Sequence, residues 1–359
     1  MKILYYTFVK DIDQDSGPVI KHLEQLGHDV LIYQPHNNRE TEYRIQTRHF
    51  QMYEDLLDRA VEHNVDLIYH HDFLSSPEYL LAELKARPNF HPKISFTFQF
   101  REANRSKARA LVLKELLDSR NIHKAVAVCL MVKNLVYPKN IRDTFSRYNF
   151  LKLAIAGETY VEHDSTFTMS KADARKKFGF DEKDFIALWT GRLLYTKGAD
   201  IFVESLKHVR DDIKIVIQKS IFSDDMGGSI LEEAKKNHEN TLVLDQMFPL
   251  GTIGPLFIAS DLAICAHRRY YEYGSVGVPP NTASAKIPFV APDFYFFNEM
   301  VKEYKMGTLF TPENPISLAQ AINYTKNYYQ DIMREANFKG FLENVYEKST
   351  WAEMAVKGL

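Results

Sequence analysis

Short apolar runs alternate with amphipathic stretches along all 359 residues, and this alternation constrains the fold more than any other feature. Such runs are typical of buried parallel strands, and the stretches between them, such as 19–26 and 50–63, have the spacing of crossover helices. The expected strands are 3–8, 29–33, 67–69, 94–98, 125–128, 152–155, 185–189, 214–218, 241–244, 262–265, 289–291 and 307–310. The sequence therefore predicts an α/β chain built from parallel, doubly wound sheets.

A break in this alternation at residues 157–170 divides the chain. The stretch has no apolar periodicity, and Ser170 with Asp173 resembles the capping pair that starts a helix. Two domains that face each other are expected to bind a ligand in their cleft, at the carboxyl ends of the strands. The expected parts are a domain over 1–157, a domain over 158–328, and a final helix over 329–359 that crosses back to the first domain.

Composition and charge exclude several functional classes. With 47 acidic and 45 basic residues the formal net charge is −2, which gives no support to a nucleic-acid partner. Cys129 and Cys265 lie in apolar runs, so a disulfide scaffold is excluded and a reducing compartment is favoured. The longest apolar run, 125–132, is far shorter than the roughly 20 residues that span a bilayer. We therefore expect a cytoplasmic protein.

Residues 101–124 are richer in bases than the rest of the chain. The bases are Arg101, Arg105, Lys107, Arg109, Lys114, Arg120 and Lys124. One interpretation is a solvated helix face, and the other is a surface that meets an anionic acceptor or a membrane. The second interpretation predicts a peripheral position at the inner face of the membrane.

The stretch most informative about chemistry is ALWTGRLLYTKGADIFVESLKHV, residues 187–209. An apolar run leads into Gly191 and Arg192, and Lys197 stands directly before the glycine that precedes a helix. Glycines permit a tight turn from strand to helix. Arg192 and Lys197 can converge on one anion, the arginine through its planar fork and the lysine as a point charge. The alternative is a surface loop with two incidental cations.

This segment resembles the diphosphate-binding segment of the retaining nucleotide-sugar glycosyltransferases of the GT-B fold, glycosyltransferase family 4 (group 1). Further matching stretches, in the order that family requires, are 16–18, 27–30, 66–72, 93–99, 260–278, 287–293, 297–301, 307–314 and 349–355. The resemblance covers essentially the whole chain. It implies two Rossmann-like domains facing a central cleft, with acceptor binding in the first and donor binding in the second. It also implies transfer of a sugar from a nucleoside diphosphate, UDP or GDP, to a hydroxyl of a glycan or lipid-linked acceptor, in surface polysaccharide or glycoconjugate synthesis.

The resemblance assigns roles on the donor side. Arg192 and Lys197 match the pair that grips the diphosphate and stabilises charge on the leaving group. Glu272 matches the acidic residue that touches the donor sugar. The other donor-binding positions that the resemblance implies are Gly17, Gly191, Gln246, Met247, Gly274, Ser275, Val276 and Asn281. Of these, Gln246 and Met247 match the loop that packs on the nucleobase.

The sequence also departs from the family. The family usually carries two glutamates in this region, and Glu272 is the candidate for the first, although the glycine spacing equally aligns Tyr271. The second is replaced by Pro280 or by Asn281, depending on the alignment, and an asparagine forms hydrogen bonds without a charge. In the first domain Gln99 stands where a histidine is common, and glutamine cannot shuttle a proton.

The acceptor or sugar side is expected to involve His71, Gln99 and Arg268. Arg268 belongs to a basic cluster that either recognises an acidic group of the donor or acceptor or simply lies on the surface. With Arg192 and Lys197 stabilising the charge on the leaving group, we expect no metal and no cofactor besides the donor substrate. Two other functions remain open at this point, a nucleotide-sugar epimerase on the same fold and a degenerate donor-binding partner subunit.

Overall fold

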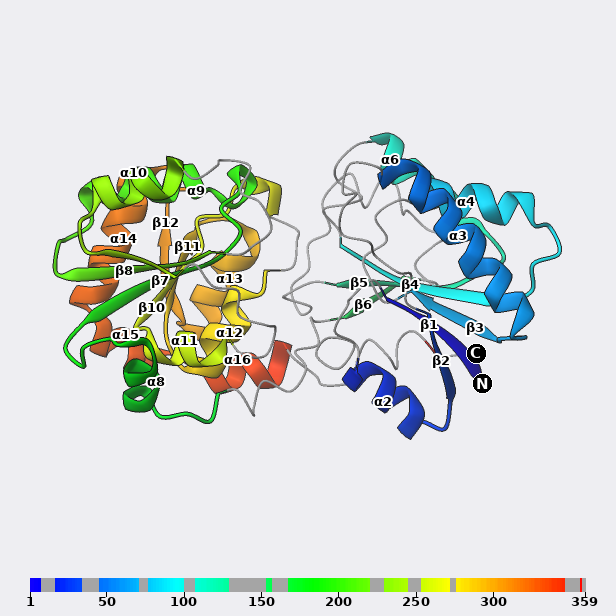
Figure 1. Ribbon diagram of the computed structural model, residues 1–359, viewed down its shortest axis with the longest axis horizontal. Helices are drawn as coiled ribbons and strands as arrows, with labels where there is room; N and C mark the ends of the chain where they lie inside the picture. The colour runs from blue at the N-terminus through cyan, green and yellow to red at the C-terminus, as the bar shows by residue number, and fades with distance from the viewer. Residues whose placement is uncertain are drawn as a thin grey trace. The chain divides into compact units, whose positions relative to one another are not determined.

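The chain folds into two compact units, Met1–Val161 with Glu347–Leu359, and Glu162–Tyr346. The computed structural model describes residues 1–7, 17–33, 45–70, 77–99, 107–128, 153–156, 167–219, 229–244, 253–271, 276–345 and 356. Each unit contains one parallel six-stranded sheet with helices on both faces (Figure 1). The predicted α/β fold with doubly wound sheets is therefore confirmed, and each expected strand has a counterpart.

The first unit has the strand order β2-β1-β3-β4-β5-β6, all neighbours being parallel. Its strands are β1 (Lys2–Tyr6), β2 (Asp29–Tyr33), β3 (Leu67–His70), β4 (Lys93–Gln99), β5 (Ile122–Val128) and β6 (Leu153–Ala156). Its helices are α2 (Gly17–Gln25), α3 (Ile45–Glu62), α4 (Pro77–Ala86) and α6 (Lys107–Asp118). In Figure 1, α2 lies on one side of the sheet and α3, α4 and α6 lie on the other.

Alternation along β1 shows why both faces of this sheet are covered. Ile3 and Tyr5 point to the α2 side, where they pack with Leu23 and where Val356 also contacts the cluster. Tyr6 points to the other face, and its hydroxyl contacts the sulfur of Met52 in α3 at 2.6 Å. Because successive strand residues face opposite sides, a strand buried on both faces is an uninterrupted apolar run.

The second unit has the strand order β12-β11-β10-β7-β8-β9, again all parallel. Its strands are β7 (Phe185–Gly191), β8 (Ile213–Lys219), β9 (Thr241–Leu244), β10 (Leu262–Ile264), β11 (Phe289–Pro292) and β12 (Gly307–Phe310). Its helices are α8 (Lys171–Phe178), α9 (Ala199–Ser205), α10 (Ser229–Asn237), α11 (Gly254–Ala259), α12 (Val278–Ala285), α13 (Tyr295–Tyr304), α14 (Pro315–Asn327), α15 (Tyr329–Glu335) and α16 (Phe338–Val345). Three short 3-10 helices are η2 (Tyr195–Lys197), η3 (Leu206–His208) and η4 (Arg269–Tyr271). This order is that of a Rossmann sheet.

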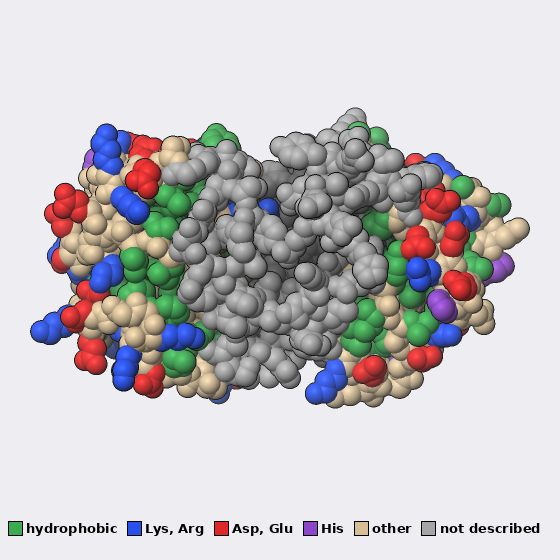
Figure 2. All heavy atoms as spheres, in the orientation of Figure 1, with side chains coloured by type: hydrophobic (Ala, Val, Ile, Leu, Met, Phe, Trp, Pro, Cys, Tyr) green, Lys and Arg blue, Asp and Glu red, His purple; other side chains and the backbone are tan. Residues whose placement is uncertain are grey.

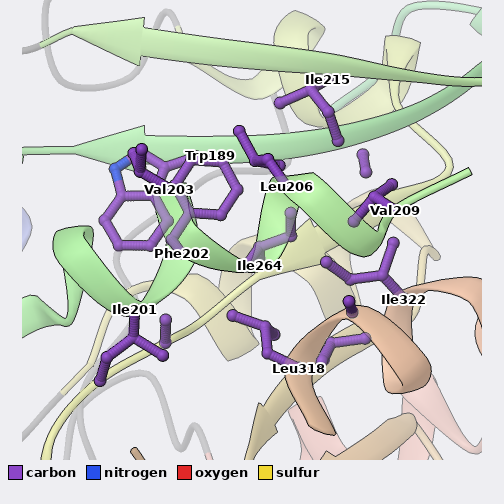
Figure 3. Packing of buried hydrophobic residues seen from close by; sticks show 14 of the residues in the cluster. Trp189, Ile201, Phe202, Val203, Leu206, Val209, Ile215, Ile264, Leu318 and Ile322 are labelled. Carbon is purple, nitrogen blue, oxygen red and sulfur yellow. The ribbon is translucent and has the colours of Figure 1, made fainter. Parts of the chain in front are cut away.

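The main core of the second unit lies between the sheet and helices α9, α10 and α14 (Figure 3). Trp189 of β7 stacks on Phe202 of α9, with ring centroids 4.7 Å apart and an interplanar angle of 17°. Leu318 and Ile322 of α14 belong to the same cluster (Figure 3). Ile186 and Leu188 are fully buried, and by strand alternation they lie on the opposite face of the sheet from Trp189. Helices α8, α11 and α12 lie on the side of the sheet opposite α9 and α10 (Figure 1).

A buried ion pair ties α8 to the amino edge of this sheet. The helix begins as predicted, with Ser170 accepting a hydrogen bond from the backbone N–H of Asp173 at 3.1 Å. Arg175 of α8 donates to the Asp261 carboxylate at 2.7 Å, and Asp261 also accepts from the backbone N–H of Ile186 at 2.8 Å. Four backbone carbonyls near the start of β7 and the end of α11 accept from the same guanidinium, those of Ala259, Asp181, Glu182 and Asp184.

The end of the chain differs from the expected arrangement in one respect. The returning segment was expected from residue 329, but α15 and α16 belong to the second unit. The physical reason is that α16 packs on this unit, where Phe341 meets the ring of Tyr304 edge-on at 5.4 Å. Residues from Glu347 onward belong to the first unit.

The described surface carries charges of both signs. On the face drawn in Figure 2, acidic and basic side chains are interspersed over both units, in keeping with the net charge of −2. Among the described residues no helix is long and apolar enough to cross a membrane. Within the same residues, no group of three or more His, Cys, Asp or Glu side chains is arranged to hold a metal ion.

Candidate functional site

The topology of the second unit identifies the edge where a ligand is expected. Strands β7 and β10 are neighbours, but the chain continues from β7 toward β8 and β9, and from β10 toward β11 and β12. The loops that follow β7 and β10 therefore leave in opposite directions, and this is where doubly wound sheets bind their ligands. The Arg192–Lys197 loop follows β7, and the segment with Arg268 follows β10.

The loop after β7 is a compact turn held by backbone hydrogen bonds. Gly191 has φ +94°, and its N–H donates to Oε1 of buried Gln218 at 3.2 Å. Lys197 N–H donates to the carbonyl of Leu194 at 3.0 Å, and this bond closes η2. Gly198, with φ +72°, then joins η2 to α9. The sequence prediction of a tight strand-to-helix turn with glycines at both ends is confirmed.

The ammonium group of Lys197 lies at the switch point. A Cβ atom added to Gly191 would be 3.1 Å from Lys197 Nζ, so the side chain folds back over the glycine. Its charge also acts on Cys265 at the end of β10, where burial raises the pKa of the thiol far above its ordinary value and the Lys197 charge opposes that rise. Lys197 is thus close to the carboxyl ends of both central strands.

Arg192 begins the same loop with its side chain exposed. Within the part of the chain that the structure describes, no carboxylate is in ion-pair contact with its guanidinium. The Arg192 and Lys197 side chains therefore stand on one short loop, one available to solvent and the other half-buried over the switch point. This arrangement suits an anionic ligand.

Arg268 has a different environment from the expected one. Its guanidinium pairs with Asp200 Oδ2 at 2.5 Å and with Glu313 Oε2 at 3.1 Å, and its Nε donates to the Tyr195 carbonyl at 3.0 Å. The same group lies 3.8 Å above the Tyr195 ring. Because two carboxylates of the chain already neutralise this charge, its contacts do not support recognition of an acidic group on the donor or acceptor.

The loop after β10 packs directly on the loop after β7. The backbone N–H of Arg268 donates to the Thr196 carbonyl at 3.2 Å. A Cβ atom on Gly198 would be only 2.0 Å from the carbonyl oxygen of Ala266, so only glycine fits there without movement. Buried His267 meets the ring of Tyr271 edge-on at 4.7 Å. These contacts fix the two loops against each other.

Of the positions expected beyond this loop, two are described. Val276 is buried, and Asn281 lies in α12, where its side-chain amide donates to the Gly277 carbonyl at 2.7 Å. Pro279 and Pro280 fall in the first turn of α12, as expected. Glu272, Gly274, Ser275, Gln246 and Met247 lie outside the described residues.

Three site residues expected in the first unit are at carboxyl ends of strands or at a helix start. Gly17 is the first residue of α2, and Gln99 is the last residue of β4. His71, directly after β3, lies outside the described residues. Their expected roles remain predictions.

Sequence reasoning missed Gln218, Asp200 and Glu313. Gln218 supports the Gly191 turn, and the two acids hold Arg268. Asp200 is recognisable only as an acid in the first turn of a helix. No local pattern indicates Glu313, since it meets Arg268 only after the strands have assembled.

Residues 170–336 match the family model of the glycosyl transferases group 1. None of the curated proteins matches the sequence. The fold is similar to that of a glycosyltransferase from Rickettsia africae ESF-5, with a TM-score of 0.70 and 16% identity over 100% of this chain and 99% of that one.

Two further solved structures are similar over the full length of both chains. Anabaena Alr3699/HepE in complex with UDP-glucose has a TM-score of 0.68 and 15% identity, with 100% of each chain covered. WaaG, a glycosyltransferase involved in lipopolysaccharide biosynthesis, has a TM-score of 0.65 and 13% identity, again with 100% of each chain covered. The second unit therefore matches the glycosyl transferases group 1 model, and the chain as a whole has the two-domain GT-B fold of the similar structures.

Proposed function

We propose that this chain is a retaining glycosyltransferase that moves a sugar from a nucleoside diphosphate donor to a hydroxyl group of a glycan or lipid-linked acceptor. The observation that carries the proposal is the Lys197 ammonium over Gly191, at the switch point and on the same loop as the exposed Arg192. A diphosphate presents several negative oxygens, and two cations of these kinds bind them in complementary ways.

In the proposed reaction, the bond between the anomeric carbon of the sugar and the β-phosphate oxygen breaks. The nucleoside diphosphate leaves with the bonding electrons, and the acceptor oxygen bonds to the same carbon. Negative charge grows on the leaving phosphate, and Arg192 and Lys197 are the groups that stabilise it. The acceptor hydroxyl attacks the anomeric carbon on the same face from which the nucleoside diphosphate departs. The proton of that hydroxyl then passes to the leaving phosphate oxygen. That route needs no side-chain base and is compatible with Gln99 at the end of β4.

The donor is proposed to be a UDP-sugar or a GDP-sugar. The complex of Anabaena Alr3699/HepE with UDP-glucose, in a similar fold, supports the first. No metal or cofactor takes part in the proposed reaction besides this donor substrate. The other residues proposed to contact the donor are Gly17, Gly191, Gln246, Met247, Glu272, Gly274, Ser275, Val276 and Asn281.

The acceptor process is proposed to be surface polysaccharide or glycoconjugate synthesis, supported by the stated involvement of WaaG in lipopolysaccharide biosynthesis. A peripheral membrane contact through 101–124 is proposed with it. Within this stretch, α6 exposes 53% of Leu111, an apolar side chain on the same helix as exposed Lys114. Sedimentation with anionic and with neutral vesicles tests the contact, and equal binding to both would contradict it.

Product analysis tests the proposed reaction. The protein is incubated with UDP-glucose or GDP-mannose and a panel of free and lipid-linked saccharides, and nucleoside diphosphate release and product configuration by NMR are followed. We expect release that depends on the acceptor, an α-anomeric product, and a loss of about 100-fold or more in Lys197→Ala. Isomerised donor without acceptor would indicate an epimerase, and donor binding without release would indicate a binding subunit.

A further inference from the structure

Arg268 joins three separate segments at the carboxyl edge of the second sheet. Tyr195 belongs to the loop after β7, Asp200 to the first turn of α9, and Glu313 to the turn between β12 and α14. One guanidinium contacts all three, with only 13% of the Arg268 side chain exposed. The loop after β10 therefore connects, through this single side chain, to the loop that carries Arg192 and Lys197.

The contacts use the shape of the guanidinium as well as its charge. Nε donates to the Tyr195 carbonyl, one terminal nitrogen pairs with Asp200 and the other with Glu313. The flat face lies 3.8 Å from the centroid of the Tyr195 ring. A lysine ammonium at this position is a point charge and cannot offer a planar fork in three fixed directions.

The backbone of Glu313 is strained in the conformation that brings its carboxylate to Arg268. Glu313 has φ +60°, in the left-handed region that residues with a Cβ atom rarely adopt. Its carboxylate is directed to Arg268 from that turn at 3.1 Å. A glycine would relieve the backbone strain at this residue but would remove the carboxylate.

We propose that Arg268 is a positioning residue that sets the place of Arg192 and Lys197 by holding the Tyr195 carbonyl, the Tyr195 ring and Asp200. This inference rests on the proposed function. In this proposal Arg268 acts on the site through the loop, since its terminal nitrogens pair with Asp200 and Glu313. Loss of the Arg268 side chain moves the Arg192–Lys197 loop. Binding of the diphosphate by these two cations is then weakened.

The experiment compares nucleoside diphosphate with monophosphate binding by calorimetry. UDP with UMP and GDP with GMP are titrated into wild type, Arg268→Lys and Arg268→Ala. We expect the diphosphate affinity to fall about tenfold in both variants and the monophosphate affinity to change less than twofold. A role in folding alone would not change the ratio of the two affinities. Arg210→Ala is the matched control, since Arg210 also pairs with a carboxylate but lies before β8, at the opposite edge of the sheet.

Asp200→Asn gives a test of opposite sign. If Arg268 bound phosphate directly, releasing it from Asp200 would raise the diphosphate affinity. If Arg268 positions the loop, the same change lowers that affinity, by about threefold or more. Asp212→Asn removes an acid at the opposite edge and controls for net charge.

The outcomes separate this inference from the proposed function. No binding of UDP or GDP by wild type would overturn both. Binding by wild type with an unchanged affinity ratio in the Arg268 variants, full rescue by Arg268→Lys, or an unchanged or raised affinity in Asp200→Asn would overturn the positioning role alone.

Discussion

Two glycines with nearly the same backbone conformation differ in their surroundings. Replacing each with alanine therefore measures how much the close approach of the loops after β7 and β10 contributes to stability. Gly179 ends α8 with φ +70°, and Gly198 ends η2 with φ +72°. A Cβ atom on Gly179 meets nothing within 4 Å, whereas one on Gly198 would lie 2.0 Å from the Ala266 carbonyl oxygen. Replacing each with alanine therefore imposes the same backbone strain but only one steric collision.

The expected magnitudes follow from these two terms. The left-handed conformation costs alanine roughly 1–2 kcal/mol at either position. At Gly198 the collision adds roughly 1–3 kcal/mol, because the loops after β7 and β10 must separate. With about 2–4 °C of melting temperature per kcal/mol, Gly179→Ala should lower the melting temperature by roughly 2–8 °C and Gly198→Ala by roughly 4–20 °C.

The assay combines thermal melting with nucleotide binding. Gly198→Ala should also lower the affinity for the nucleoside diphosphate, because the displaced loop carries Arg192 and Lys197, while Gly179→Ala should leave that affinity unchanged. Equal losses of stability in the two variants, or an unchanged affinity in Gly198→Ala, would refute the argument that the contact with Ala266 holds the loop.

Three further predictions concern the rest of the second unit and the site. Arg175→Ala should destabilise the protein by about 3 kcal/mol in urea unfolding, at the low end for a broken buried pair because Lys171 still pairs with Asp261 at 2.6 Å. A loss no larger than that of Arg210→Ala, an exposed pair worth under about 1 kcal/mol, would contradict this. In Cys129→Ser, Cys265 should react with a thiol reagent at pH 8 only as fast as the protein unfolds, since burial raises its pKa; rapid reaction of the folded protein would be the contrary result. Nucleotide affinity should be the same with EDTA, and a loss would show that a metal takes part.

The sequence was a sufficient guide to the strands and to the start of the second unit. Parallel strands buried on both faces, such as β7 and β8, are continuous apolar runs and so are visible without a structure. The capping of α8 by Ser170 is a local interaction of neighbours in the chain and was equally predictable. The glycines at both ends of the Arg192–Lys197 loop belong to the same class of local signal.

Contacts between distant segments were not predictable in this way. The sequence left open whether Arg268 meets a ligand or lies on the surface, because an arginine beside a ligand loop has the same one-dimensional pattern whether its partners are substrate oxygens or the chain's own acids. Asp200 and Glu313 come from segments far apart in the sequence. The assignment of α16 to the second unit was unpredictable for the same reason, because it depends on the contact between Phe341 and the distant Tyr304.

The most direct test of the central claim is whether Arg192 and Lys197 hold a nucleoside diphosphate. Thermal melting is measured with UDP, GDP, ADP, CMP and buffer alone for wild type, Arg192→Ala and the control Arg210→Ala. A ligand at 100 times its dissociation constant stabilises by about 2.7 kcal/mol, or roughly 5–11 °C. We predict that one diphosphate shifts wild type and Arg210→Ala, and that Arg192→Ala keeps the wild-type melting temperature in buffer but loses the shift. No shift with any nucleotide, or the same shift in Arg192→Ala, would contradict the account.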